Sequence, residues 1–276
     1  MLGERLTEMA AQAERIFPDG HELDGIADVL RVMASKIVIP GARPIPPKHE
    51  AHDDRPKPHP SETEEHVIGR EEGADMILSF DTSRCIHARF CVLGAPTVFL
   101  SGVEGRWLFP DNMKTADLRG ICHNCPSGAI SYEPKGDTPP EPAPQVNIVN
   151  IREDGPYAFR APISIDGKEI GYRATLCRCG ASKNKPFCDG SHKHIGFKAT
   201  GEPETRPSEP LAVRDGPLEI TPLPNGPLQI TGNLEVCAGT GRNVDRVTTA
   251  RLCRCGASKT KPFCDNTHLK IGFKSD

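Results

Sequence analysis

The stretch "CRCGASKNKPFCDGSH" at residues 177–192 decides how this sequence is interpreted, because it returns as "CRCGASKTKPFCDNTH" at residues 253–268. The two copies align without gaps over residues 176–198 and 252–274, and 18 of these 23 positions are identical. Each copy places three cysteines and one histidine at the same spacing. Packing alone rarely requires the same four metal-binding side chains twice, so the sequence predicts two metal centres.

The spacing within the first copy suggests how its donors meet. Cys177 and Cys179 are two positions apart, so in an extended segment both side chains point to one face. Cys188 and His192 are four positions apart, as on one face of a helical turn, and Asp189 between them favours a helix start. The second copy repeats this arrangement with Cys253, Cys255, Cys264 and His268. A set of three cysteines and one histidine also suits zinc, so the spacing alone leaves the metal open.

Both motifs resemble the CDGSH iron–sulfur domain family, and the resemblance covers roughly residues 146–276. In that family three cysteines and one histidine hold a [2Fe–2S] cluster, with the histidine on the more exposed iron. The resemblance implies one cluster on Cys177, Cys179, Cys188 and His192, and a second on Cys253, Cys255, Cys264 and His268. The second copy departs from the family pattern at Asn266 and Thr267, where the family has Gly and Ser. Because Asn tolerates a left-handed backbone, we expect this site to keep its cluster.

Strand-like stretches precede both copies. Apolar residues alternate at Phe159, Ala161, Ile163 and Ile165 and again at Leu228, Ile230, Leu234 and Val236, which is typical of half-buried strands. We therefore expect two β-rich units, residues 146–200 and 201–276. Single-motif members of the resembled family form homodimers. The tandem motif implies an intramolecular pseudo-twofold, and a monomer in preference to an obligate homodimer.

A third cysteine group lies earlier, in "RCIHARFCVLGAPTVF" at residues 84–99 and "ICHNCPSGAI" at residues 121–130. Cys85 and Cys91 match the outer positions of a bacterial C-x₂-C-x₂-C run, whose middle position is Ala88 here, and Cys125 precedes a proline as a remote ligand does. The group resembles the divergent mono-cluster 4Fe–4S domain of ferredoxins. We assign residues 74–133 to such a ferredoxin-like domain.

The nuclearity of this third cluster depends on a fourth ligand. Cys85, Cys91 and Cys125 alone predict [3Fe–4S]. His87 lies one place from the missing position and Cys122 lies three before Cys125. Either side chain would complete a [4Fe–4S] cluster, and the sequence leaves both possibilities open beside a role off the iron.

The remaining segments complete an α+β chain. Apolar residues at helical spacing predict an N-terminal helical hairpin over residues 1–38. Proline and charge without periodicity predict linkers over residues 39–73 and 134–145. No apolar run reaches the length of a membrane-spanning helix, and the first residues lack a secretory signal, so we expect a cytoplasmic protein without a membrane partner.

Composition narrows the function. A net charge of −3 disfavours nucleic-acid binding, and eleven cysteines, mostly in three local groups, favour metal binding over disulfides. The leftover Cys237 is expected to be a buried small hydrophobe. The basic residues Arg178, Lys183, Lys185 and Lys193 are expected to form a solvated rim around the first motif.

No nucleotide-binding loop or hydrolase motif is present, and we assign no catalytic residue. The sequence therefore favours an electron carrier that serves a partner oxidoreductase. The alternatives are a reductase that acts on a small substrate at a histidine-ligated cluster, and a protein that stores or transfers clusters. A histidine ligand raises a cluster's reduction potential, so we expect the ferredoxin-like centre to feed electrons to the other two.

Overall fold

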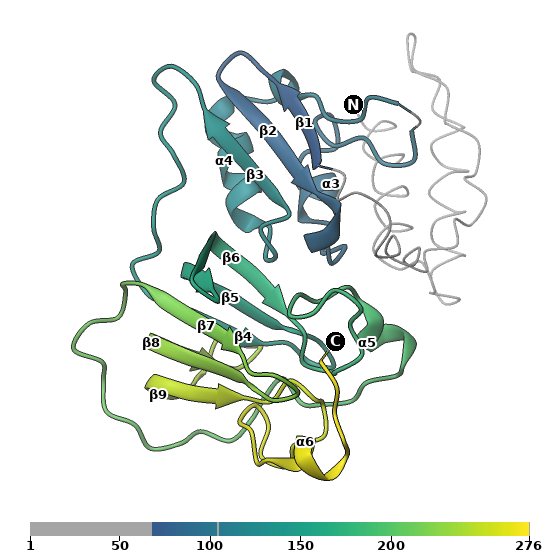
Figure 1. Ribbon diagram of the computed structural model, residues 1–276. Coiled ribbons are helices and arrows are strands. Elements are labelled where there is room, and N and C mark those ends of the chain that lie inside the picture. Colours follow the sequence, from purple (N-terminus) through teal and green to yellow (C-terminus); the bar gives the residue numbers. More distant parts are fainter. Residues whose placement is uncertain (1–67, 104, 276) are drawn as a thin grey trace, which may run out of the picture. The chain divides into compact units, whose positions relative to one another are not determined.

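The computed structural model (Figure 1) describes residues 68–103 and 105–275. The helical hairpin predicted for residues 1–38 and most of the linker predicted for residues 39–73 lie outside these described residues. The described chain mixes helices and strands and is mostly β, as the expected α+β class requires. Within it, no helix is both long and apolar enough to cross a membrane.

Residues 68–134 form what we call the three-strand segment. Its antiparallel strands lie in the order β1-β2-β3, and α3 and α4 pack together beside them (Figure 1). The elements are β1 (Ile68–Glu72), β2 (Met76–Asp81), η1 (Thr82–Arg84), α3 (Phe90–Gly94), η2 (Pro110–Asn112), α4 (Thr115–Asn124) and β3 (Ile130–Pro134). Strand β1 falls in the range that we predict as linker. Its sequence IGREE is charged and lacks the apolar alternation that marks a strand, since it lies at the edge of the sheet.

A small core holds this segment together. Leu78 on β2, Leu118 on α4 and Ile130 on β3 are almost fully buried. Trp107 packs edge-on against Phe80 with ring centroids 4.9 Å apart. The core fixes the ends of η1, α3 and α4, which are the places where the cysteines of this segment occur.

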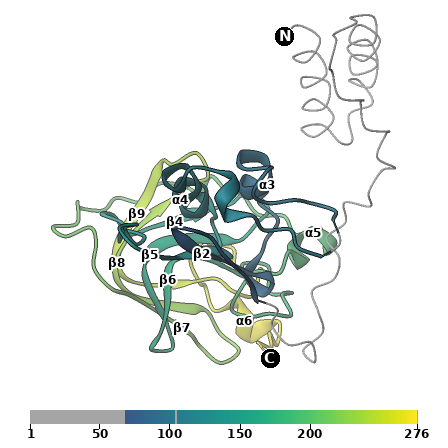
Figure 2. The same cartoon turned by 90° about the horizontal axis from the view of Figure 1, so that it is seen from above.

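Residues 147–275 form the repeat region, in which each unit contributes three strands and one short helix. Unit 1 contains β4 (Ile148–Ile151), β5 (Tyr157–Ile165), β6 (Lys168–Leu176) and α5 (Ser191–His194). Unit 2 contains β7 (Leu218–Pro222), β8 (Leu228–Cys237), β9 (Asn243–Leu252) and α6 (Thr267–Lys270). Figure 2 shows these strands from above.

The first strand of each unit pairs with strands of both units. Strand β4 pairs antiparallel with β5 of its own unit and parallel with β8 of the other, while β7 pairs antiparallel with β8 and parallel with β5. The two parallel pairings have the same register. Ile148 pairs with Glu235, and Glu219, which lies 71 positions after Ile148, pairs with Ser164, which lies 71 positions before Glu235. Strands β4, β5, β7 and β8 therefore form a closed ring of pairings. Strand β6 also pairs with β5, and β9 also pairs with β8.

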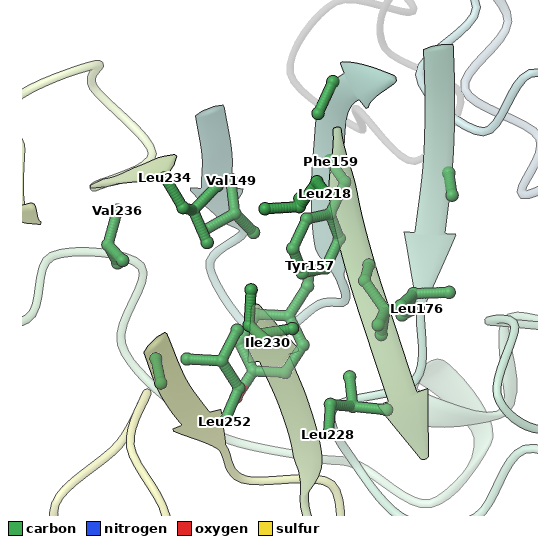
Figure 3. Close-up of a cluster of buried hydrophobic side chains, with 14 of the residues drawn as sticks. Val149, Tyr157, Phe159, Leu176, Leu218, Leu228, Ile230, Leu234, Val236 and Leu252 are labelled. Atoms are coloured by element: carbon green, nitrogen blue, oxygen red, sulfur yellow. The ribbon is translucent and has the colours of Figure 1, made fainter. Parts of the chain in front are cut away.

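One hydrophobic core fills the repeat region (Figure 3). All the alternating residues that we predict as inward-facing are buried, namely Phe159, Ala161, Ile163, Ile165, Leu228, Ile230, Leu234 and Val236. Val149 and Leu218 from the first strands of the two units join the same cluster. Because a strand buries its apolar face only against another element, the two units stabilise each other through this shared core.

Candidate metal centres

The four donors of each motif form two close pairs. In unit 1, the sulfurs of Cys177 and Cys179 are 3.8 Å apart, and Cys188 Sγ is 3.4 Å from His192 Nδ1. A tetrahedral metal with metal–sulfur bonds of about 2.3 Å holds two sulfurs about 3.8 Å apart, and a sulfur and a nitrogen about 3.6 Å apart. Each pair is therefore spaced as two ligands of one metal ion.

Unit 2 repeats these distances, with 3.8 Å between Cys253 Sγ and Cys255 Sγ and 3.4 Å between Cys264 Sγ and His268 Nδ1. Among the described residues, no group of three or more His, Cys, Asp or Glu side chains is arranged to hold a single metal ion. The donors of each unit thus form two pairs and not one tetrahedral set. Each pair is spaced to share one metal ion.

Backbone hydrogen bonds create the pairs. Strand β6 ends at Leu176, so Cys177 and Cys179 lie directly after the strand and not within it. The returning chain bonds to the strand end, because Cys177 N–H donates to Pro186 O at 2.8 Å and Cys188 N–H donates to Thr175 O at 3.0 Å. The same bonds recur in unit 2, from Cys253 to Pro262 and from Cys264 to Arg251. The identical sequence of the two loops therefore folds twice into the same donor frame.

The aspartate of each motif closes its loop. Asp189 lies one residue before the helix cap, which is Gly190 in the left-handed region at φ 86°. Its carboxylate accepts from Ser191 N–H at 2.9 Å and from Lys183 N–H at 2.8 Å. The prediction of Asp189 as the helix-start residue is thus wrong by one position, because a left-handed residue must turn the chain before the helix begins. Asn266 adopts this conformation in unit 2 at φ 66°, as expected for asparagine.

In each unit, one cysteine of the first pair has a lowered pKa, which favours its thiolate form. The hydrogen bond between the sulfurs lowers the pKa of Cys177 to about 6 and raises that of Cys179. In unit 2 the same bond lowers the pKa of Cys255 to about 6. Backbone N–H groups also point at sulfur, as Ala181 N–H does toward Cys179 Sγ at 3.4 Å. Hydrogen bonds of this kind stabilise a thiolate, which is the form that binds a metal.

The two ligand loops touch each other. Gly180 lies so close to unit 2 that a Cβ there would be 2.8 Å from Cys255 O, and a Cβ on Gly256 would be 2.6 Å from Cys179 O. Tyr157 from unit 1 donates its hydroxyl to Cys253 O at 2.8 Å. The two centres are therefore neighbours, and each loop limits the position of the other.

Arg178 lies between the first two cysteines and is only 1% exposed, so its predicted place in a solvated rim is wrong. It donates to Arg152 O and Thr200 O, both at 2.7 Å, and its Nε has no partner. These acceptors are uncharged carbonyls, which leave the charge uncompensated. Arg254 in unit 2 likewise donates to Gly226 O. A buried cation favours an anionic neighbour, and a cluster held by three thiolates supplies one.

The two histidines differ in exposure. His192 is partly exposed, whereas His268 is 8% exposed. Burial lowers the pKa of His192, and the charge of Lys193 lowers it further. A neutral imidazole is the form that binds a metal, so this environment suits a ligand.

In the three-strand segment, Cys85, Cys91 and Cys125 each lie at or next to the end of a helical element. Cys85 follows η1, Cys91 lies in α3 and Cys125 follows α4. The pKa of Cys85 is raised to about 11, mainly by burial and in smaller part by the charges of Cys125 and Cys91. The charges of Cys125 and Cys91 thus reach Cys85, although 40 residues separate Cys85 from Cys125 in the chain. This grouping fits a third centre.

The two candidates for a fourth ligand lie on different sides of this group. Cys122 is fully buried in α4, and its pKa is raised to about 12 by burial and then by the charges of Cys125 and Cys91 among others. His87 is exposed and has a left-handed backbone at φ 55°, and its N–H donates to Cys85 Sγ at 3.4 Å. Cys122 therefore approaches from the core and His87 from the solvent side.

Two further findings concern residues outside the motifs. Cys237 is buried at the end of β8, as expected for a small hydrophobe. The contacts of Arg173, by contrast, could not be found from the sequence. This residue of β6 donates to Cys125 O at 2.9 Å in the three-strand segment, and no local pattern marks it.

Comparison with known proteins places three segments of the chain. The family model described as "Iron-binding zinc finger CDGSH type" matches residues 154–193 and 225–269, and the model described as "Divergent 4Fe-4S mono-cluster" matches residues 71–135. CDGSH iron-sulfur domain-containing protein 1 of Rattus norvegicus is 44% identical over 50 residues, which cover 18% of this chain and 43% of that protein.

A CDGSH iron-sulfur domain-containing protein 2 homolog of Trichoplax adhaerens is 35% identical over 65 residues, covering 23% of this chain and 46% of its own length. The homolog of Drosophila ananassae is 49% identical over 39 residues, covering 14% and 28%. The chain thus spans less than half the length of these curated relatives. No solved structure matches it.

Proposed function

We propose that this chain, which carries two segments of the CDGSH iron-binding type and one of the divergent 4Fe-4S mono-cluster type, is an electron-transfer protein that serves a partner oxidoreductase. The proposal rests on the spacing of the repeat donors, which form four pairs, each fit for one metal ion. Iron–sulfur clusters supply one-electron exchange when bound at such donors.

The ligand sets in this proposal are those of the motifs. One [2Fe–2S] cluster would be held by Cys177, Cys179, Cys188 and His192, and the other by Cys253, Cys255, Cys264 and His268. The third centre would be held by Cys85, Cys91 and Cys125. The buried guanidinium of Arg254 supports the first of these assignments, because its positive charge interacts with Cys177.

The nuclearity of the third centre follows from its fourth ligand. With the three cysteines alone it would be [3Fe–4S], and with Cys122 or His87 it would be [4Fe–4S]. Separate Cys122→Ser and His87→Ala variants distinguish the sources, because only the true ligand converts a [4Fe–4S] signal into a [3Fe–4S] signal when it is removed.

We further propose that the two units form an intramolecular pseudo-dimer and that the protein works as a monomer. The matching register of the parallel pairings of β4 and β7 supports this proposal. A cytoplasmic location is part of the proposal. It is supported by the eleven cysteines, which form no disulfide with one another, since disulfides are rare in reducing compartments.

Low-temperature EPR of anaerobically purified protein, before and after reduction with dithionite, tests the proposal. Two [2Fe–2S] signals after reduction are expected. A signal already present in the oxidised sample would identify [3Fe–4S], whereas a faster-relaxing signal that appears on reduction would identify [4Fe–4S]. A colourless sample that is silent in both states would overturn the proposed function.

Cluster transfer is a second candidate, favoured by the partial exposure of His192. A ligand at the surface can be protonated from solvent, which weakens its bond to a metal. Transfer of colour to an added apo-ferredoxin, faster at pH 6 than at pH 8, would support this function. Stable retention of both clusters under these conditions would exclude it.

A further inference from the structure

Unit 1 differs from unit 2 in what its ligand loop touches outside the repeat. Asn184, between the second and third cysteines, donates its side-chain amide to Ser83 O in the three-strand segment at 2.7 Å. The guanidinium of Arg84 lies over the ring of Phe187, with 5.5 Å from its carbon to the ring centroid. Ser83 and Arg84 directly precede Cys85, and Phe187 directly precedes Cys188. Two side-chain contacts therefore join the residues that precede Cys85 to the ligand loop of unit 1.

Arg173 adds contacts to the backbone of Cys122 and Cys125 in the three-strand segment. It is 4% exposed, and its guanidinium donates to the carbonyls of Cys122 and Cys125 and to Ile130 O at 3.2 Å. The carbonyl of Arg173 in turn accepts from Arg84 Nη2 at 2.5 Å. A cation at the carbonyls that end α4 is also favoured by the helix dipole.

The chain between the two parts completes the site. The carboxylate of Glu141 accepts two hydrogen bonds from one edge of the Arg173 guanidinium, from Nε to Oε1 at 2.8 Å and from Nη2 to Oε2 at 2.7 Å. This bidentate geometry fixes the guanidinium plane. Glu141 lies in the proline-rich stretch that we predict as linker, so that stretch holds Arg173 in place.

Unit 2 lacks the two polar side chains that reach the three-strand segment from unit 1. Arg173 corresponds to Thr249 and Asn184 to Thr260, and both threonines are exposed. Phe263, which corresponds to Phe187, is instead covered by Arg206, whose guanidinium carbon lies 3.8 Å from the ring centroid. The two ligand loops are nearly identical in sequence, so the difference lies in the residues that meet the three-strand segment.

We infer that unit 1 is the intramolecular electron port for the three-strand segment, and that Arg173 and Asn184 are the positioning residues that create it. This inference rests on the proposed function. Cys85, Cys91 and Cys125 would hold the centre that gives up one electron, and Cys177, Cys179, Cys188 and His192 would hold the centre that accepts it, an exchange in which no bond forms or breaks. A low-potential one-electron donor supplies the third centre. The loop of unit 2, which contacts the unit 1 loop at Gly180 and Gly256, would hold the centre that passes the electron on to the partner.

The experiment uses the relaxation of electron spins, which a nearby paramagnetic centre accelerates. The holoprotein is studied by EPR power saturation, with His192→Cys and His268→Cys variants used to assign the two [2Fe–2S] signals. We expect the unit 1 signal to saturate at higher microwave power than the unit 2 signal. Arg173→Thr and Asn184→Thr, which introduce the residues of unit 2, should each reduce this difference between the two signals. Lys168→Thr, an exposed change on the same strand, is the matched control.

Amide hydrogen exchange gives a readout that needs no cluster. Arg173→Thr should accelerate exchange over residues 122–130, and Lys168→Thr should not. Equal saturation of the two signals in the parent protein, or a difference unchanged in both threonine variants, would overturn the inference. If no cluster signal is found, the proposed function fails, and exchange over residues 122–130 still decides whether Arg173 joins the two parts.

Discussion

The contact between the two ligand loops offers a sharp test of how the repeat is assembled. Gly256 has φ of +79°, and an added Cβ would lie 2.6 Å from Cys179 O and 3.0 Å from Cys179 C. Both neighbours are backbone atoms, which cannot rotate away as a side chain would. A Gly256→Ala variant therefore combines an unfavourable backbone conformation with a direct collision between the units.

The magnitude can be worked from these two effects. A left-handed alanine costs about 1–2 kcal/mol, and overpacking against a fixed neighbour costs about 1–3 kcal/mol. Alanine also lowers the conformational entropy of the unfolded chain, which stabilises the folded state by about 0.4–1 kcal/mol. We expect the free energy of unfolding to fall by about 2–4 kcal/mol in total. Gly272→Ala is the matched control, because Gly272 has φ of +61° and no atom within 4 Å of the added Cβ.

Denaturant unfolding of the purified holoprotein, followed by far-UV circular dichroism, measures both variants. The control should lose only about 1 kcal/mol, from the backbone conformation alone. Gly256→Ala should also weaken iron retention in both centres, since Cys179 belongs to unit 1. Equal losses of stability in the two variants would refute the argument, because the collision between the loops would then contribute nothing.

Three more predictions test the site. Tyr157→Phe removes the buried hydroxyl that bonds to Cys253 O, so stability should fall by about 1–2 kcal/mol and unit 2 should lose iron first, which differential EPR during chelation would detect. Asp265 has a pKa below its usual value because backbone N–H groups bond to it, so its stabilisation is present above about pH 4 and is lost as pH falls. Acid unfolding curves should therefore differ between the parent protein and Asp265→Asn, and matching curves would contradict this. His192→Cys and His268→Cys should each lower the reduction potential of their own centre and improve retention at acidic pH, and a redox titration with unchanged potential would show that the histidine is not a ligand.

Local patterns predicted much of the repeat region. Alternation identified the inward-facing residues of β5 and β8, since burial on a strand follows the period of the backbone. The spacing of Cys177, Cys179, Cys188 and His192 predicted two donor pairs, and the pairs occur at metal-ligand distances. These features depend on a few neighbouring residues, and for that reason the sequence could reveal them.

Other features depend on contacts that sequence order does not show. The burial of Arg178 comes from Arg152 O and Thr200 O, which lie 26 and 22 positions away. Strand β1 pairs with β2 although its residues are charged, because an edge strand needs only one neighbour. In each case the deciding partner is distant in the chain, and a local window suggests solvent exposure instead.

The ligand loops of the two units differ at five positions. Two of these differences preserve the backbone of the loop, and three change the side chains that the loop presents outside the repeat. Gly190 and Asn266 differ in side chain, yet both hold the left-handed turn that the donor frame requires. Ser191 and Thr267 both give their N–H to the preceding aspartate. The other three differences fall on the outside, at Asn184 and Thr260, Lys193 and Leu269, and His194 and Lys270.

Of these outer positions, Asn184 bonds to the three-strand segment, whereas Leu269 is 74% exposed beside His268. An exposed leucine next to a ligand contributes nothing to the donor frame, and it differs from the lysine that unit 1 carries at the same position. The differences between the copies thus concern what each loop meets outside the repeat. If unit 2 delivers electrons to the partner, Leu269→Lys should slow reduction of that partner and leave the reduction potentials of all three centres unchanged. Stopped-flow kinetics with the isolated partner would show this effect, and an unchanged rate would assign delivery to another surface.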